Sequence, residues 1–237
     1  MTEKVQFRLF TTPSKLIFQA KKSDCLAVAE LHLNGIGTGF LTRLGVPFLI
    51  KLYEAAQVSK HALLFVSNSE GGAIDGYISA TVNTGKFYTD FLLSRYSIGA
   101  IPALFRFLLS SRATGVGGQK RQKENPFVKC LESLLYPFKK KQEITCEAEL
   151  LSIVVDPEAR GKGIADELLN ELKQRLLERG NDRFKVVVGS ENLRACRFYE
   201  KNGGRLAKRI EVHRGAESNV YVFVNQKNES FGQPVDQ

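Results

Sequence analysis

The sequence predicts an α/β fold in which helices flank a mixed central sheet with at least one parallel pair of strands. Two observations support this class. From residue 147 onwards, apolar strand-like runs alternate with amphipathic helical patterns. In addition, 43% of the 237 residues are hydrophobic, which is enough for a packed core. Because no internal repeat or long linker divides the chain, we expect one domain over residues 1–237.

The first expected helix covers residues 23–33. Ser23 or Asp24 can cap it, because short polar side chains accept hydrogen bonds from the first backbone N–H groups. Leu26, Ala29 and Leu33 recur at helical spacing, so we expect them to form its buried stripe.

A glycine-rich loop follows, and residues 46–57 then predict a second helix, with Pro47 in its first turn. Residues 61–67 and 75–83 favour strands, joined by a hairpin turn.

Residues 86–143 are expected to be a helical, basic insertion before the central strand. They hold eleven Lys and Arg against four Asp and Glu, a net of +7 out of +9 for the whole chain. Within this insertion, residues 91–141 combine apolar and amphipathic helical patterns with the lysines at 139–141. This combination suits peripheral contact with an anionic membrane surface. The plainer alternatives are that its helices pack on the sheet or form a homodimer face. Residues 226–237 are expected to be a flexible tail.

The second half of the chain has the clearest pattern. Residues 147–155 predict a central strand that stops at Asp156 and Pro157, because proline cannot donate to the ladder. An amphipathic helix follows and ends at Gly180. Its expected buried stripe is Ala165, Leu168, Leu169, Leu172 and Leu176. The remaining elements are a strand at 183–190, a helix at 192–203, and closing strands at 205–212 and 219–225.

The turn before this helix is basic and rich in glycine: Arg160, Gly161, Lys162 and Gly163. The first N–H groups of a helix lack partners and carry partial positive charge, and glycine lets a ligand approach them closely. The pattern therefore predicts a phosphate site, best suited to a pyrophosphate. Neither the P-loop pattern nor the G-x-G-x-x-G fingerprint is present.

Other site classes find little support. The four cysteines and three histidines are scattered, so neither a disulfide framework nor a metal site is expected. No aromatic-basic interleaving accompanies the positive charge, so no nucleic-acid partner is expected. The first residues contain no apolar run typical of a secretory signal, and we expect a cytoplasmic location.

Two stretches in order, "LLSIVVDPEARGKGIADELL" and "VVVGSENLRACRFYEKNGGRL", resemble the two central motifs of the GNAT superfamily of N-acetyltransferases. The clear resemblance covers about residues 147–224. It implies an enzyme that uses acetyl-CoA as co-substrate and needs no metal.

The resemblance also implies roles for residues. Backbone groups of Ile153, Val154 and Val155 would bind the pantetheine arm, and an N–H of Val154 or Val155 could stabilise the oxyanion. Tyr199 would protonate the leaving thiolate, with packing against the sheet as its plainer alternative. The remaining implied cofactor-binding residues are Arg160, Gly161, Lys162, Gly163, Ile164, Ala165, Asn192 and Phe198, of which Asn192 could simply cap its helix.

A base must also accept the amine proton. Glu147 and Glu149 lie two apart at the start of the central strand, so we expect them to share a face. Either could be the base, although both could be solvated carboxylates at a strand end. Some family members carry a glutamate on the strand after the binding helix, but that stretch here, "KVVVGS", has no carboxylate. A water chain is the alternative.

The acceptor is expected to be a small-molecule amine, with Arg43 meeting a carboxylate or phosphate on it. The glycine-rich loop together with "VPFLIKLYEAA" resembles GNAT proteins associated with bacterial glycan assembly, which implies an amino sugar or a nucleotide-linked amino sugar. Two alternatives stay open: transfer to a protein N-terminus or lysine, and a non-catalytic acyl-CoA-binding regulatory module.

Overall fold

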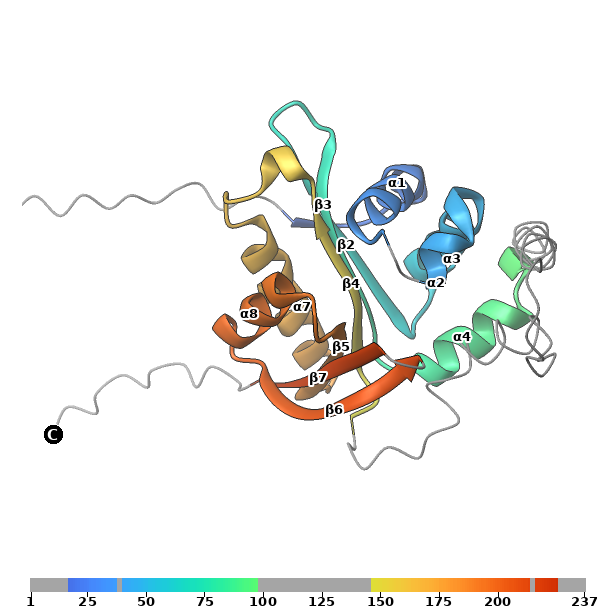
Figure 1. The fold of residues 1–237 in the computed structure, drawn as a ribbon. Helices are drawn as coiled ribbons and strands as arrows, with labels where there is room; N and C mark the ends of the chain where they lie inside the picture. Colours follow the sequence, from blue (N-terminus) through green and yellow to red (C-terminus); the bar gives the residue numbers. More distant parts are fainter. Residues whose placement is uncertain (1–16, 38–39, 98–145, 214–215, 226–237) are drawn as a thin grey trace, which may run out of the picture.

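The computed structural model describes residues 17–37, 40–97, 146–213 and 216–225. These residues form a seven-stranded sheet in the order β1-β2-β3-β4-β5-β7-β6, so β4 is central (Figure 1). β4 and β5 are parallel, and the other neighbouring pairs are antiparallel. The predicted mixed α/β sheet is confirmed. Its strands are β1 (Ile17–Gln19), β2 (Ala62–Asn68), β3 (Ile74–Thr81), β4 (Glu149–Val155), β5 (Arg183–Gly189), β6 (Arg205–His213) and β7 (Ala216–Val224).

Helices cover both faces of the sheet. α7 and α8 lie on one face, and α1 and α3 lie on the other (Figure 1). The helices are α1 (Cys25–Gly35), α2 (Phe40–Arg43), α3 (Gly45–Val58), α4 (Thr84–Leu93), α7 (Ile164–Glu178) and α8 (Leu193–Lys201), with short 3₁₀ turns at Lys22–Asp24 and Pro157–Ala159. The chain thus carries two separate apolar layers, one on each side of β4.

The predicted stripe of α1 was wrong. Leu26 and Leu33 are 50% and 36% exposed, and only Ala29 of the expected three is buried. The buried residues are instead Cys25, Val28, Ala29, Leu31 and His32, and all of them except Leu31 lie at positions i, i+3, i+4 and i+7. A polar residue, His32, thus lies in the core, whereas its predicted neighbour Leu33 does not.

The predicted stripe of α7 was nearly right. Leu168, Leu169, Leu172 and Leu176 are fully buried, and Ile164 joins them, while Ala165 is half-buried. The helix ends before Gly180, whose positive φ of 77° allows the chain to turn away. This helix packs over β2, β3 and β4, and its buried leucines form one hydrophobic cluster with the side chains on that face of the sheet.

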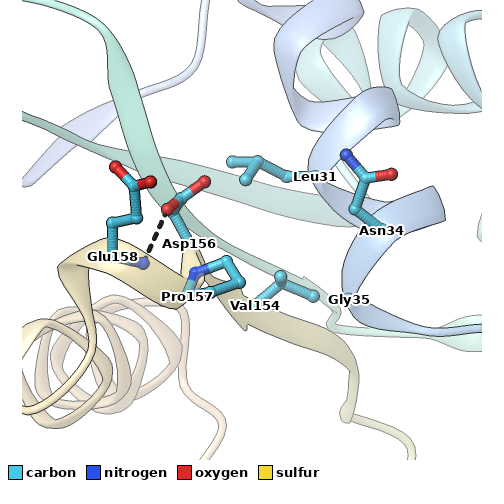
Figure 2. A pocket seen from close by; sticks show the side chains of 7 residues that line it. All are labelled: Leu31, Asn34, Gly35, Val154, Asp156, Pro157 and Glu158. Carbon is cyan, nitrogen blue, oxygen red and sulfur yellow. Dashed lines mark hydrogen bonds between the residues drawn. The ribbon is translucent and has the colours of Figure 1, made fainter.

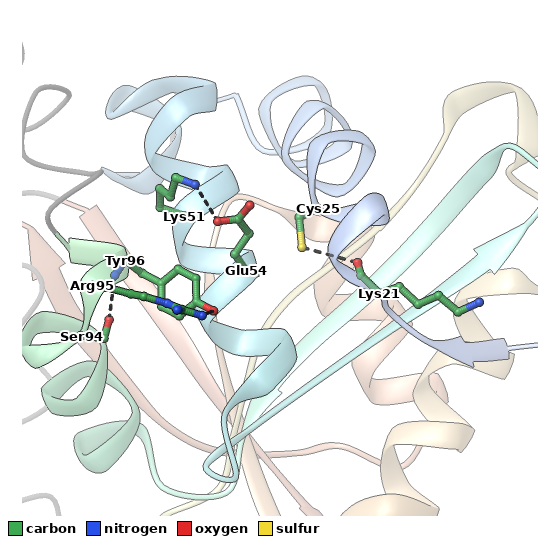
Figure 3. Close-up of polar contacts among 7 residues, drawn as sticks. All are labelled: Lys21, Cys25, Lys51, Glu54, Ser94, Arg95 and Tyr96. Carbon is green, nitrogen blue, oxygen red and sulfur yellow. Dashed lines mark hydrogen bonds and ion pairs between the residues drawn. The ribbon is translucent and has the colours of Figure 1, made fainter.

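The beginning of the expected insertion forms α4. Asn83 caps this helix, because its Oδ1 accepts a hydrogen bond of 2.8 Å from Lys86 N–H. Phe87, Tyr88 and Phe91 pack against α3. The chain just beyond α4 stays beside α3, and Figure 3 shows Arg95 and Tyr96 near the Lys51–Glu54 ion pair. The rest of the expected insertion, 98–143, and the expected tail, 226–237, lie outside the described residues.

Candidate active site

The turn that joins β4 to α7 presents open backbone. Gly161 and Gly163 have φ of 80° and 79°, and a Cβ added to either would meet no atom of the described residues within 4 Å. Gly163 is the N-cap residue of α7, and no side chain of the described residues caps the helix there. Arg160 and Lys162 are exposed beside it. Free N–H groups at a helix start, two cations and empty space together make a surface suited to phosphate.

The two parallel strands beside this turn separate. β4 and β5 pair only at Glu149–Lys185 and Leu150–Val186, although both strands continue for several residues. Over those residues β5 remains paired with β7, and β4 remains paired with β3. The edge of β4 that faces β5 is therefore open from Leu151 to Val155, and this opening leads to the Arg160–Gly163 turn.

A β-bulge lies where the strands separate. Leu150 pairs with Ala80 and Ser152 pairs with Ser79, so Leu151 is the extra residue in β4. Leu151 packs toward α3 and α4, and Ser152 Oγ lies 3.3 Å from the hydroxyl of Tyr53 on α3. The bulge therefore points two consecutive side chains to the same face of the sheet.

The direction of the backbone groups on β4 follows from one hydrogen bond. Asp156 N–H donates to Asp75 O at 2.8 Å, and along a strand the backbone groups of successive residues point to opposite sides. Those of Val154 therefore point to β3, while those of Ile153 and Val155 point to the open side. The carbonyl of Val155 already accepts from Arg160 Nε at 3.1 Å, which holds that side chain over the end of the opening.

α8 carries Tyr199 into the core. The side chain is 5% exposed and packs on Phe223 and Tyr221, with ring centroids 6.2 and 6.0 Å away. Burial raises the pKa of its hydroxyl. The neighbouring Phe198 is half-buried against the same cluster. Asn202 ties the end of this helix to the start of α7, because its Nδ2 donates to Asp166 Oδ1 at 3.0 Å.

Asn192 caps α8, since its Oδ1 accepts from Ala195 N–H at 3.1 Å. The capping role offered as its plainer alternative is therefore present. One oxygen lone pair and the amide N–H groups of Asn192 remain for other partners, because an asparagine side chain has two donors and one two-lone-pair acceptor.

The two candidate bases have different environments. Glu149 is the first residue of β4, with its Oε2 3.3 Å from Thr84 Oγ1 and 3.6 Å from Lys185 Nζ. Desolvation raises the pKa of this carboxyl, and Lys185 and Thr84 oppose the shift. Glu147 precedes the strand, is exposed, and accepts from Asn83 Nδ2 at 2.7 Å. Both carboxylates reach the first turn of α4, and Glu149 is the one closer to the β-bulge.

A hollow of about 460 Å³ lies on the opposite face of β4 from α7 (Figure 2). α1 lines it with Leu31, Asn34 and Gly35, and the end of β4 lines it with Val154, Asp156, Pro157 and Glu158. Its charged lining residues are both acidic. Arg43 lies elsewhere on this face, exposed at the end of α2.

Sequence reasoning missed a buried polar cluster on the same face. The hydroxyl of Tyr53 lies 2.6 Å from His32 Nδ1, 3.0 Å from the hydroxyl of Tyr77 and 3.3 Å from Ser152 Oγ. Burial lowers the pKa of His32 to about 4 and raises that of Tyr53 to about 12. The cluster joins α1, α3 and β3 to the bulge of β4, and no local pattern in the sequence indicates it.

Comparison with known proteins identifies this arrangement. Residues 136–204 match the Acetyltransferase (GNAT) family. The chain carries a GNAT acetyltransferase domain. Since GNAT acetyltransferases are acyltransferases, the chain is an enzyme of this class. The match covers the open turn, the separating strands and Tyr199, which are the features described above.

Solved structures share the fold. An acetyltransferase from Salmonella typhimurium, solved with its cofactor acetyl-CoA, has 16% identity and a TM-score of 0.52, over 91% of this chain and 96% of its own. An N-acetyltransferase from Staphylococcus aureus Mu50 has 16% identity and a TM-score of 0.53, over 89% and 98%. The ribosomal-protein-S18-alanine N-acetyltransferase from Escherichia coli has 14% and 0.52, over 92% and 99%. These similarities establish the GNAT fold.

Two further observations concern the described residues alone. No group of three or more His, Cys, Asp or Glu side chains among them is placed to hold a metal ion. None of their helices has the length and apolarity that crossing a bilayer requires. Peripheral membrane contact through 91–141, the homodimer and the cytoplasmic location stay predictions.

Proposed function

We propose that this GNAT domain transfers the acetyl group of acetyl-CoA to a primary amine by direct attack. One observation carries the proposal: the opening between β4 and β5 leads to a helix start with free N–H groups and two open glycines. An extended, amide-containing arm fits an unpaired strand edge, and a pyrophosphate fits the helix start. Acetyl-CoA has both parts, in that order.

In this proposal the backbone of Ile153 binds the pantetheine arm as a neighbouring strand would, and the N–H of Val155 is left for the reaction, since its C=O already accepts from Arg160. The amides of Gly161 to Ala165 hold the pyrophosphate, because the N–H of Arg160 already donates to Pro157 O at 3.4 Å, and Lys162 supplies additional positive charge. Asn192 and Phe198 contact the arm from α8. Val154 contributes its side chain rather than its backbone, because its N–H and C=O point to β3.

The chemistry then needs three groups. The amine nitrogen attacks the thioester carbonyl carbon, and the N–H of Val155 stabilises the oxyanion. As the C–S bond breaks, Tyr199 gives its hydroxyl proton to the thiolate. Glu149 takes the excess proton of the amine through a chain of waters, because it begins β4 and Val155 ends it, roughly 20 Å away. We favour Glu149 over Glu147 because its raised pKa brings it closer to the working pH of a base.

We place the acceptor in the hollow beside Asn34, Asp156 and Glu158. The acetyl donor and the acceptor then approach β4 from opposite faces, so neither blocks the other. Carboxylate and amide groups bind ammonium and hydroxyl groups, which supports an amino sugar or a nucleotide-linked amino sugar. In this arrangement Arg43 meets an anionic group on a larger acceptor.

A second candidate is the amine of a protein N-terminus or lysine. The two carboxylates of the hollow favour any cationic amine, and a peptide could bind there as well as a sugar. Acetylation assays with glucosamine and with a lysine-containing peptide separate the two, since only the true acceptor class should reach saturation at millimolar concentration.

The first test is calorimetric titration of the chain with acetyl-CoA, CoA and ATP. We expect acetyl-CoA and CoA to bind with a roughly micromolar Kd and ATP to bind weakly, because ATP lacks the pantetheine arm. Gly163→Glu should abolish binding, since it adds a negative charge and a side chain at the pyrophosphate.

Gly180→Glu is the matched control. Gly180 has the same left-handed backbone, with φ of 77°, but lies at the other end of α7. Both variants therefore carry the same strain and the same charge change. Equal losses of acetyl-CoA affinity in the two variants would refute the assignment of the turn as the pyrophosphate site. The same holds if the wild-type chain does not bind acetyl-CoA, and a non-catalytic role would then be favoured.

A further inference from the structure

A second pocket lies on the α7 and α8 face, between α8 and the β6–β7 hairpin. Its volume is about 330 Å³. α8 lines it with residues at positions i, i+3, i+4 and i+7, and β7 lines it with residues at i, i+2 and i+4, so each element presents one continuous side. Ala195, Phe198 and Tyr199 of the same helix pack instead into the core with α7. The pocket is thus separate from the Arg160–Gly163 turn.

Asn219 lines this pocket and carries a buried polar atom without a partner. The residue is 7% exposed, and its Nδ2 lies 3.5 Å from Cys196 Sγ. Its Oδ1 is buried and has no hydrogen-bond partner. Rotating the amide by 180° would exchange the two atoms and still leave one of them unpaired. Buried polar groups in native proteins are nearly always satisfied, so this amide calls for a group that enters the pocket.

The sides of the pocket carry charges of both signs. Arg197 and Glu200 come from α8, and Arg209 and Glu217 come from the hairpin. Arg197 Nε donates to Leu193 O at 3.3 Å, and Glu200 Oε1 accepts from the Tyr221 hydroxyl at 2.7 Å. Within the described part of the chain, no ion pair joins these arginines to these glutamates.

The β6–β7 register brings three of these groups together. Arg209 is directly opposite Asn219, and Glu217 lies two residues from Asn219 on the same face of β7. A cation, an amide and an anion therefore occupy opposite and next-but-one positions on one face of the β6–β7 pair. Such a row matches a small molecule that carries an ammonium and a carboxylate on neighbouring atoms.

We propose that this pocket binds a free α-amino acid. Its carboxylate pairs with Arg209, and its ammonium donates to Asn219 Oδ1 and Glu217. The volume is at the lower end of the range of about 300–1,000 Å³ that small-molecule sites occupy, which suits a ligand of this size. This site is additional to acetyl transfer and does not depend on the proposed acceptor.

Calorimetric titration of the full chain with each of the twenty protein amino acids tests this site. Sodium acetate and methylammonium chloride, each with a single charge, are the comparison ligands. We expect at least one amino acid to bind one site per chain, with acetate and methylammonium at least about tenfold weaker, because each lacks one ionic partner. Wild-type chain that binds none of the twenty below 10 mM, as an approximate ceiling for a specific site, overturns the proposal.

Two variants locate the binding. Arg209→Glu reverses the charge that faces the carboxylate of the ligand, and Asn219→Ala removes the amide. Each variant should raise the Kd for the amino acid by roughly tenfold or more. Arg205→Glu makes the same charge change on the same strand outside the pocket and should bind as the wild type does. Because Arg209 is exposed, Arg209→Glu keeps the test sharp if Asn219→Ala fails to fold. Unchanged binding in Arg209→Glu overturns the proposal.

Discussion

At the scale of single residues, Tyr199 combines a buried ring with a hydroxyl that forms no hydrogen bond within the described residues. Burial raises the pKa of this hydroxyl, so it stays protonated, as the proposed acid role requires. Tyr199→Phe keeps the packing on Phe223 and removes only the proton donor. We expect kcat to fall by roughly 10²–10⁴-fold while the Kd for acetyl-CoA changes by less than about twofold.

Steady-state kinetics and calorimetry measure these two quantities. Tyr221→Phe is the control, because Tyr221 lies in the same aromatic cluster and donates to Glu200. It should retain kcat. If Tyr199→Phe turns over at the wild-type rate, the proton of the thiolate comes from another group.

Glu149 should determine the acid limb of the pH–rate profile. Desolvation raises the pKa of its carboxyl, and a base works only when ionised. The rate should therefore rise with pH through a midpoint above the ordinary glutamate value of about 4.3. Glu149→Gln should lower kcat/KM by roughly 10²-fold or more and remove this limb.

Glu147→Gln is the matched control and should keep both the rate and the limb, since Glu147 is exposed and bound to Asn83. The profile is read from initial rates between pH 4 and 9. A limb that survives in Glu149→Gln belongs to the acceptor amine or to another carboxyl.

Local chemistry decides which of these residues could be found from sequence. The Arg160–Gly163 turn was predictable, because glycine conformation and helix-start charge are properties of a few adjacent residues. The cluster of His32, Tyr53, Tyr77 and Ser152 was not, because its members come from four elements and meet only in the folded chain.

At the scale of elements, hydrophobic periodicity predicted most helices and strands. It did not predict how α1 packs on the sheet or how β4 pairs with its neighbouring strands. The hydrophobic pattern of α1 favoured Leu26 and Leu33, whereas the helix buries Val28, Ala29 and His32 and ends with Gly35 against Val154 of β4. The bulge at Leu151 and the separation of β4 from β5 could not be predicted from the sequence either, because the register of a strand depends on its partner strand. Close helix–strand packing and strand separation are properties of pairs of elements.

The contact of α1 with β4 can be tested at Gly35. A Cβ at this position would overlap the Val154 side chain, which is β-branched and stiff. Gly35→Ala should therefore force α1 away from β4 and lower the free energy of unfolding by about 1–3 kcal/mol, measured by urea denaturation. Gly37→Ala, where an added Cβ meets nothing within 4 Å, should have a much smaller effect.

A double-mutant cycle identifies the cause. Val154→Ala removes the two methyl groups that the new Cβ would meet, so the double variant should lose less stability than the sum of the single variants. Strict additivity would show that Gly35→Ala acts through its own backbone rather than through the contact with β4.

At the scale of the whole molecule, β4 lies between two layers of helices that carry different parts of the candidate site. The layer of α7 and α8 provides the open turn and Tyr199, and the layer of α1 and α3 provides the acidic hollow and the His32 cluster. The order of strands and helices in the second half was predictable, because alternating apolar patterns fix it locally. The sequence does not predict that the two layers meet at one bulged strand, because the position of β4 depends on the pairing of all the strands in the sheet.

Burial of His32 should make global stability depend on pH. Its pKa is about 4 in the folded protein, because burial disfavours the charged ring, against about 6.5 in the unfolded chain. Between these values the unfolded chain binds a proton that the folded chain does not, so stability rises with pH. The contribution is complete above pH 6.5 and is lost as pH falls toward 4, with a maximum of about 3 kcal/mol.

Urea denaturation at pH 7 and pH 5 measures this dependence. His32→Gln removes the titrating ring, so its free energy of unfolding should change less between the two pH values than that of the wild type. His61→Gln is the control: the side chain of His61 is 18% exposed and its Nε2 lies 3.8 Å from Asp90, so the variant should keep the wild-type dependence. Equal pH dependence in His32→Gln and the wild type would show that His32 is protonated in the folded state as readily as in the unfolded one. The polar cluster behind the β4 bulge would then have to accommodate a charge, and the hydroxyls of Tyr53 and Tyr77 would be its first partners.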